Sequence, residues 1–518
     1  MIRLGAAFLL AAAVSLPFAN VPVIDDWLYA YSVEQLLHDG QFRILDYSCR
    51  YNLMQVSWGA LFSLPAGFSF AALRVSTLVA ALAGLAAFHD LLLRRTGDTS
   101  LSLWATALLA FNPIFFRLSL SFMTDVPLVA IVAISFWLFD GGLRRGTRTL
   151  ILLAFALAVA GYLVRELSVV IPVALIAGAL FEVPRRVSVK TIAAVAAVAL
   201  VGFALEYWWI RSVQGASSGL NVRTEGLRHV FAIPFVDYVR ALVQMLLTVA
   251  AFASPLALAT LRRRGEVLWT AGIGATLVVV ALLVDGVPFG GNEVLSPLGL
   301  GMSRVLLPGQ PTVGTAGEAL RLVVCVVAAL SLAVVLLELV HVARRGWRER
   351  NGLDAAWISF GLGQVAALLV LWLWQDRYDL VILPAVLWLC AVRAARDGWT
   401  MRATAAGVIA FALVSVLGTR DDVHLNQRAW EAEAWLRAQG VPAREIDGGY
   451  VLNGWRMYAH VDDYAPGFPA ADVPFLFSKE PLPYELRTTP PPSEALRVFT
   501  WPRTWLSEAR LYAARRSS

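Results

Sequence analysis

The sequence predicts a polytopic α-helical membrane protein with a small α/β domain at its C-terminal end, and three observations support this. Hydrophobic residues make up 58% of the 518 residues and charged residues only 15%, whereas soluble chains carry about a quarter charged residues. Several apolar segments run for about the 18 residues that span a bilayer. The composition then changes after residue 419. We therefore expect a membrane domain over residues 1–419 and a soluble domain over residues 420–518.

The Arg clusters predict the topology of the membrane domain. Nearly all basic residues are Arg, and they lie in short clusters between apolar runs, as at Arg94-Arg95 and Arg144-Arg145. With about thirteen membrane helices, every multi-Arg cluster falls on one side, as the positive-inside rule requires. Residues 1–19 are the first helix, or alternatively a cleaved signal peptide. The other expected helices cover residues 70–93, 101–116, 126–139, 150–164, 167–181, 191–210, 238–261, 267–284, 319–342, 355–374, 380–392 and 401–418.

This topology places three substantial loops, at residues 20–69, 211–237 and 285–317, and the tail on the outer side of a bacterial inner membrane. Residues 20–69 form the first outer loop, and the soluble tail is expected to be periplasmic. In the tail, residues 426–439 have the pattern of an amphipathic helix that ends at Gly440. Alternating stretches at 449–458 and 496–501 predict short strands, and prolines 490–492 predict a rigid extended link.

The composition also excludes several classes of function. The net charge is +6, but the basic residues form no continuous stripe that would follow a phosphate backbone, so no nucleic-acid partner is expected. The three cysteines give no disulfide framework. The six His are scattered without metal-ligand spacing, so no cofactor or metal site is expected from the residues themselves.

Acidic residues at two predicted helix starts are the first candidates for chemistry. Asp25 and Asp26 directly follow the first helix, and residues 27–37 resume helical spacing at the membrane surface. A helix N-terminus favours an ionised carboxylate, which at this depth can take a proton from a sugar hydroxyl. Asp125 begins the helix that contains Pro127, on the same outer side. The alternative for each acid is simple helix capping.

Arg residues on the same outer side are the second candidates, because Arg suits a phosphate through its planar fork of donors. Arg165 and Glu166 lie between two short helices, and a charged pair there is costly unless it lines a cavity. Arg377 and Tyr378 lie between two later helices, and Arg50 closes the first loop. The alternatives are mutual ion pairs or side chains that extend to the membrane surface.

These segments, taken in order, resemble the GT-C membrane glycosyltransferases, and most closely the aminoarabinose and protein-mannosyl transferase type with its Rgt-like bacterial branch. The resemblance covers most of the chain in short motifs: residues 25–30 and 36–40, Ala72-Leu73-Arg74-Val75, residues 112–127, Arg377-Tyr378 through Leu383-Pro384, and residues 435–436 and 453–455. At residues 49–52 the chain departs from the Lys-Pro-Pro pattern of the aminoarabinose branch, which disfavours a lipid A acceptor.

The resemblance implies an inverting, metal-independent or weakly divalent-metal-linked transfer of a hexosyl or pentosyl group. The donor would be a polyprenyl-phosphate sugar, and the acceptor a hydroxyl of an envelope lipid, glycan or protein. By the family pattern Asp25 is the first candidate for the general base and Asp26 the second. Asp125, Arg165, Glu166, Arg377, Tyr378 and Arg50 are then the expected substrate-binding residues.

The alternative function is a transporter or flippase of lipid-linked sugars. Such a protein needs ionisable groups or broken helices near the middle of the bilayer. In this sequence the prominent acids lie at the outer ends of the predicted helices instead. Their position favours the transferase.

Overall fold

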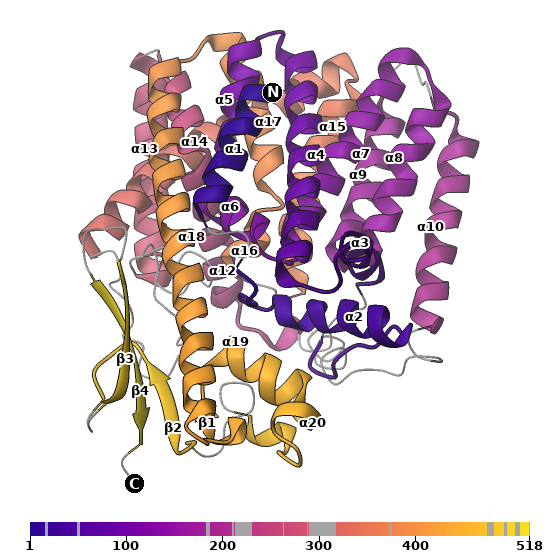
Figure 1. Cartoon of the computed structure of the whole chain (residues 1–518). Helices are drawn as coiled ribbons and strands as arrows, with labels where there is room; N and C mark the ends of the chain where they lie inside the picture. Colours follow the sequence, from indigo (N-terminus) through magenta and orange to yellow (C-terminus); the bar gives the residue numbers. More distant parts are fainter. Residues whose placement is uncertain are drawn as a thin grey trace.

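The computed structural model describes most of the chain: residues 1–15, 19–48, 52–182, 187–209, 212, 230–262, 264–286, 288–289, 318–371, 375–473, 481–491, 495–502 and 508–516. It shows a bundle of long helices with a smaller α/β part at one end (Figure 1). Arg50, one of the predicted site residues, lies outside the described residues.

The bundle contains a helix in every segment that the hydrophobic pattern predicts. Two short helices, α2 (Asp26–Asp39) and α3 (Leu53–Ser63), lie in the first loop. The bundle helices are α1 (Ile2–Val14), α4 (Phe70–Thr96), α5 (Thr99–Ala110), α6 (Pro113–Ser119), α7 (Asp125–Arg145), α8 (Arg148–Ala160), α9 (Val170–Phe181), α10 (Val189–Trp209), α12 (Phe235–Ala257), α13 (Arg264–Asp285), α14 (Glu318–Glu349), α15 (Gly352–Val370), α16 (Asp376–Asp379), α17 (Leu383–Asp397) and α18 (Met401–Ala438).

Eight helices of the described chain are long and apolar enough to cross a membrane. The count rises to nine if α5 and α6, which meet at a bend of 66°, are taken as one span. Three shorter apolar segments, which include α1, α8 and α9, accompany them. The chain is therefore a multi-pass membrane protein, and the total of about thirteen spans stays a prediction.

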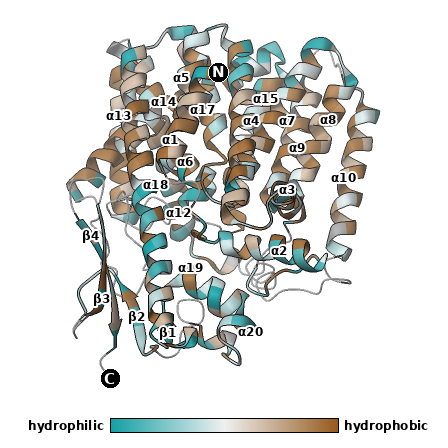
Figure 2. Cartoon of the chain, viewed as in Figure 1, coloured by the Kyte–Doolittle hydropathy of each residue, from teal (hydrophilic) through white to brown (hydrophobic). Residues whose placement is uncertain are grey.

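Two of the predicted Arg clusters meet at the end of the bundle opposite the C-terminal part. Arg94 pairs with Asp140 at 3.3 Å, and Arg144 donates a hydrogen bond to the Arg94 carbonyl. At the other end of α4, Phe70 packs edge-on against Trp455 of the C-terminal part. Figure 2 shows apolar residues along the bundle and hydrophilic residues at its ends. Which end of the bundle faces the outside of the membrane stays a prediction from the Arg clusters.

Helix α18 corrects the prediction for the tail. The sequence pattern predicts one helix at 401–418 and a separate amphipathic helix at 426–439, but α18 runs without a break for 38 residues. It passes from the bundle into the C-terminal part (Figure 1). Nothing between residues 419 and 425 is a helix-breaking Gly or Pro, so the helix continues and carries the C-terminal part on a rigid stem.

The C-terminal part contains a four-stranded sheet of order β1-β2-β4-β3. Its strands are β1 (Ile446–Asp447), β2 (Tyr484–Arg487), β3 (Ala495–Pro502) and β4 (Glu508–Arg515); β1 pairs parallel to β2, and the other pairs are antiparallel. The strand predicted at 496–501 is confirmed as part of β3. The strand predicted at 449–458 is wrong, because that segment forms α19 (Tyr450–Asn453) and the π-helix η7 (Gly454–Ala459).

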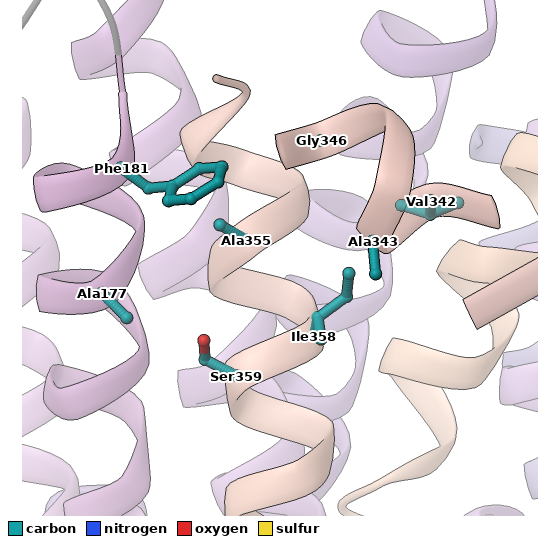
Figure 3. Close-up of a pocket in the computed structure, with 8 residues that line it drawn as sticks. All are labelled: Ala177, Phe181, Val342, Ala343, Gly346, Ala355, Ile358 and Ser359. Carbon is teal, nitrogen blue, oxygen red and sulfur yellow. The ribbon is translucent and has the colours of Figure 1, made fainter. Parts of the chain in front are cut away.

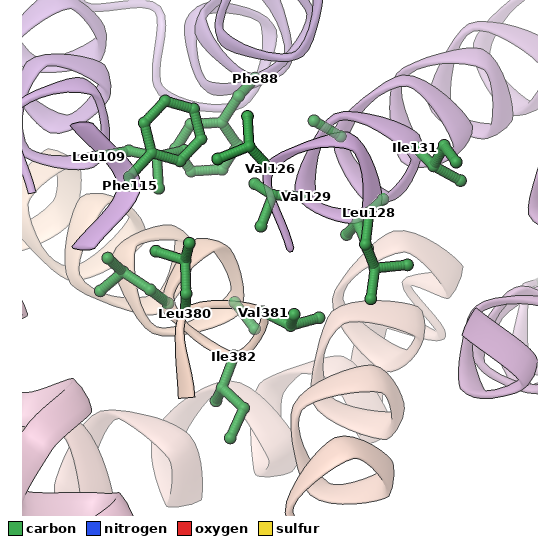
Figure 4. Close-up of a cluster of buried hydrophobic side chains, with 14 of the residues drawn as sticks. Phe88, Leu109, Phe115, Val126, Leu128, Val129, Ile131, Leu380, Val381 and Ile382 are labelled. Atoms are coloured by element: carbon green, nitrogen blue, oxygen red, sulfur yellow. The ribbon is translucent and has the colours of Figure 1, made fainter. Parts of the chain in front are cut away.

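Buried aliphatic and aromatic side chains fill the space between the first half of the bundle and the segment after α16. Figure 4 shows Phe115, Val126 and Leu380 among them, and all three are buried. Val126 directly follows Asp125, and Leu380 lies two residues after Tyr378. The same close-packed core therefore fixes the backbone on both sides of the candidate site.

Candidate active site

Asp25 lies at the start of α2 and turns its side chain away from that helix. It occupies the N-cap position but makes no capping hydrogen bond. Instead its Oδ2 atom accepts a hydrogen bond from Nη1 of Arg377 at 2.7 Å. The preceding residue, Ile24, has a positive φ of 55°, which is unusual for a β-branched residue and marks a strained turn. The capping alternative therefore does not account for Asp25.

Arg377 is held in place by its own neighbours on the short helix α16. Its Nε donates to Oε1 of Gln375 at 2.9 Å, and its Nη2 donates to the hydroxyl of Tyr378 at 3.3 Å. The guanidinium is largely buried, whereas the Asp25 side chain keeps 20% of its surface exposed. The pair thus presents a carboxylate toward the surface, backed by a fixed cation.

Arg165 and Asp125 continue the cluster on the inner side of Tyr378. The Arg165 guanidinium lies 4.1 Å from the centre of the Tyr378 ring and forms an ion pair with Asp125. Both charged residues are 1% exposed. Asp125 is the first residue of α7. Its Oδ1 atom accepts from Arg165 and its Oδ2 atom has no hydrogen-bond partner among the described residues, so simple capping does not account for this acid either.

The structure therefore brings five of the predicted residues into one continuous chain of contacts. It runs from Asp25 to Arg377, then to Tyr378, Arg165 and Asp125. The sequence pattern identifies each of these residues but not their connection. Glu166 is half-buried beside Arg165 at the start of η2 (Glu166–Val169).

Asp26, the second predicted base, is fully enclosed. Its side chain accepts hydrogen bonds from the backbone N–H groups of Val23 at 2.7 Å and Phe122 at 3.4 Å. Burial raises the pKa of Asp26 to about 7, against the opposing effect of the nearby Arg74 guanidinium. Because Asp26 is 0% exposed, the hydroxyl of an acceptor substrate cannot reach its carboxyl group. Its contacts tie the Asp25 turn to the loop before α7, which is a positioning role.

Three buried charged residues near Asp26 were not singled out as site residues from the sequence. Arg74 donates to the carbonyl oxygens of Ala19 and Val21, and Arg117 pairs with Asp422 of α18. All three charged side chains are buried. Arg74 thereby anchors the segment that leads into Asp25, and the Arg117–Asp422 pair joins α6 to α18. Arg74 and Arg117 lie within family-like motifs of the sequence, whereas Asp422 gave no signal.

A cavity lies elsewhere in the bundle, away from the charged cluster. Among the residues that the structure describes, no three His, Cys, Asp or Glu side chains gather as metal ligands. A cavity of about 210 Å³ lies between α9, α14 and α15 (Figure 3). It is lined by residues such as Phe181 and Ala355. These lie at the opposite ends of α9 and α15 from Arg165 and Arg377, so the cavity is separate from the charged cluster.

Comparison with known proteins gives a family match within the membrane domain. Residues 57–209 match the family described as dolichyl-phosphate-mannose-protein mannosyltransferase. This match covers less than a third of the chain and shows a similarity to that family over the matched stretch alone. The matched stretch contains Asp125 and Arg165, whereas Asp25 and Arg377 lie outside it. No match was found among curated proteins.

Two solved structures are similar to this chain at low identity. One is ArnT from Cupriavidus metallidurans bound to undecaprenyl phosphate: identity is 13%, the TM-score is 0.41, and the match covers 99% of this chain and 97% of that one. The other is the archaeal oligosaccharyltransferase AglB from Archaeoglobus fulgidus in complex with an inhibitory peptide and a dolichol-phosphate. Its identity is 14% and its TM-score 0.39, and the match covers 86% of this chain but only 58% of AglB.

Proposed function

We propose that this protein is a glycosyltransferase of the GT-C type, which transfers a sugar from a polyprenyl-phosphate donor to a hydroxyl group of an envelope lipid, glycan or protein. The observation that carries the proposal is the pairing of Asp25 with Arg377 at 2.7 Å, at the start of a helix in the first loop. The carboxylate of Asp25 can accept a proton, and the guanidinium of Arg377 can bind a phosphate. A reaction in which a hydroxyl oxygen displaces a phosphate from a sugar carbon requires both groups.

The reaction follows from the chemistry of the two groups. The acceptor oxygen attacks the anomeric carbon of the donor and forms the new glycosidic bond, while its proton passes to the Asp25 carboxylate. The bond from the anomeric carbon to the phosphate oxygen breaks, and its electron pair leaves with the prenyl phosphate. Arg377 offsets the negative charge that grows on this leaving phosphate. Attack opposite the leaving group inverts the anomeric centre.

Arg165 takes part in this mechanism through Tyr378. The guanidinium of Arg165 is 1% exposed and paired with Asp125, so it is fixed in position. It packs on the Tyr378 ring, which Arg377 also contacts. Its direct contact with phosphate stays a prediction from the sequence. Glu166 and Arg50 likewise remain predicted substrate-binding residues.

The proposed location is the inner membrane of a bacterium, with the site and the C-terminal part on the periplasmic face. The Arg clusters at the opposite end of the bundle support this orientation through the positive-inside rule. A donor with its prenyl chain in the bilayer then presents its phosphate at the depth of α2. The acceptor arrives from the water outside.

The test uses the purified full-length protein in lipid nanodiscs. It is incubated with a panel of synthetic prenyl-phosphate sugars and with membrane extract as the source of acceptor. Release of prenyl phosphate, followed by mass spectrometry, is expected for at least one donor. If proteoliposomes instead moved these lipids across the bilayer with no release from any donor, the proposal would be replaced by the transporter alternative.

A further inference from the structure

An aromatic cluster joins the first loop to the C-terminal part beside Asp25. Trp27, the second residue of α2, stacks on Tyr47 with ring centres 6.4 Å apart. Tyr450 and Tyr458 of the C-terminal part approach the Trp27 ring edge-on, at 5.9 and 6.1 Å. Trp27 is fully buried between these rings. The C-terminal part is therefore packed directly onto the helix that begins at Asp25.

A glycine allows this close approach. A Cβ atom added at Gly454 would lie 2.5 Å from two ring carbons of Trp27, a separation that no side chain tolerates. The backbone of η7 therefore rests against the indole itself. The contact between Gly454 and Trp27 therefore brings α19, which directly precedes Gly454, close to Asp25.

A buried hydrogen-bonded turn positions Tyr450 at the start of α19. Oδ1 of Asp447 accepts from the side-chain amide of Asn453 at 2.9 Å, and Oδ1 of Asn453 accepts from the Gly448 backbone N–H at 2.9 Å. Gly449 has a positive φ of 85°, a conformation that glycine adopts without strain. The turn thus delivers Tyr450 to one fixed position.

Tyr450 points its phenol at the proposed catalytic base. The Asp25 carboxylate acts on it both through its charge and through a side-chain hydrogen bond. Burial first, and then the charge of Asp25, raise the pKa of Tyr450 well above its ordinary value. The phenol therefore stays protonated at neutral pH, and it can only donate its proton to the carboxylate in a hydrogen bond.

We propose that Tyr450, supplied by the C-terminal part, is a positioning residue that orients the Asp25 carboxylate together with Arg377. This inference rests on the proposed function of Asp25 as the base. Two donors on different elements, one on α16 and one on α19, fix the carboxylate in one rotamer. The free lone pair then faces the acceptor hydroxyl, and a base held in this way needs no reorganisation when the proton arrives.

The test compares Tyr450→Phe with Tyr458→Phe in the full-length protein in nanodiscs. Each change removes one hydroxyl and keeps the ring that packs on Trp27, so the second variant is a matched control. For Tyr450→Phe we expect kcat/KM for prenyl phosphate release to fall roughly ten- to hundredfold, the range for a hydrogen bond to a charged group. The acid limb of its pH–rate profile should move to higher pH, because the ionised carboxylate has lost a donor.

Tyr458→Phe should keep the wild-type rate and profile. If the two variants match in both readouts, the proposal is overturned. A second measurement does not depend on turnover: the unfolding of Tyr450→Phe, Asp25→Asn and the double variant forms a double-mutant cycle. Coupling between the two changes supports the contact, and strict additivity overturns it. If the wild-type protein is inactive but the cycle still shows coupling, the proposed function is contradicted. The contact between Tyr450 and Asp25 is supported in that case.

Discussion

The buried Asp125–Arg165 pair gives the sharpest test of how the site is held. Asp125→Asn removes the buried counter-charge of Arg165 while keeping its volume, and Arg165→Met removes the charge that faces Asp125. Oδ2 of Asp125 has no hydrogen-bond partner in the described residues, so its charge depends on the guanidinium. Breaking a buried pair by removing one partner costs about 3–5 kcal/mol. We expect each single variant to lose that much free energy of unfolding.

The double variant separates the ion pair from simple loss of packing. It leaves neither charge buried alone, so its loss should be smaller than the sum of the single losses by at least about 2 kcal/mol. The contact of Arg165 with Tyr378 is lost in both Arg165 variants and cancels in the cycle. The assay is equilibrium unfolding in mixed micelles with increasing SDS, followed by far-UV circular dichroism.

An exposed pair serves as the control for this cycle. Arg345 donates to Glu349 at 2.9 Å, one helical turn away and with both side chains in solvent. Arg345→Gln should change the free energy of unfolding by only about 0–1 kcal/mol. Additive losses in the Asp125–Arg165 cycle, or losses no larger than this control, would refute the reasoning that the pair holds the site together.

Three further predictions concern the surroundings of the base. The pKa of Asp26 rises from 3.8 to about 7 in the fold, so the folded protein holds a proton that the unfolded chain releases. Stability should therefore fall as the pH rises through this window, and Asp26→Asn should flatten the dependence of the thermal midpoint on pH. Gly454→Ala places a methyl group against Trp27 and should destabilise by about 1–3 kcal/mol. Gly202→Ala, in open space within helix α10, should instead stabilise by up to about 1 kcal/mol in the same unfolding assay. Arg377→Gln should lower kcat for prenyl phosphate release roughly a hundredfold; an unchanged kcat would remove Arg377 from the mechanism.

The helices of the bundle could be predicted because a bilayer imposes a simple rule on them. Every spanning segment must be apolar and satisfy its own backbone hydrogen bonds, so hydropathy alone locates α4 or α14. No comparable rule constrains the secondary structure of the soluble tail. The alternating pattern at residues 449–458 predicted a strand, yet the side chains of Asp447 and Asn453 close a turn instead, and helix α19 forms there. Local side-chain hydrogen bonding outweighed the strand pattern.

The site was predictable in its residue types and not in its pairings. Acid at a helix start and Arg between short helices are visible in a sequence, and both features identified Asp25, Asp125, Arg165 and Arg377. That Asp25 meets Arg377, 352 positions away, follows only from the packing of α16 against the first loop. Tyr450 carried no signal at all, because its role depends on how the C-terminal part is placed.

The separate roles of the two neighbouring acids also required the structure. Asp25 and Asp26 are adjacent and chemically identical, so the family pattern could only rank them. In the fold, one turn of backbone sends the first toward Arg377 and the second into a pocket of backbone N–H groups. Exposure, rather than residue type, distinguishes the proposed base from the residue that anchors it.

The most direct test of the central claim is the transfer rate of Asp25→Asn, measured with the donor that the wild-type protein accepts and with donor binding measured in parallel. The amide keeps the size of the side chain but cannot take the acceptor proton. We expect prenyl phosphate release to fall about 10²–10⁴-fold while the donor still binds. Wild-type release by Asp25→Asn would contradict the account.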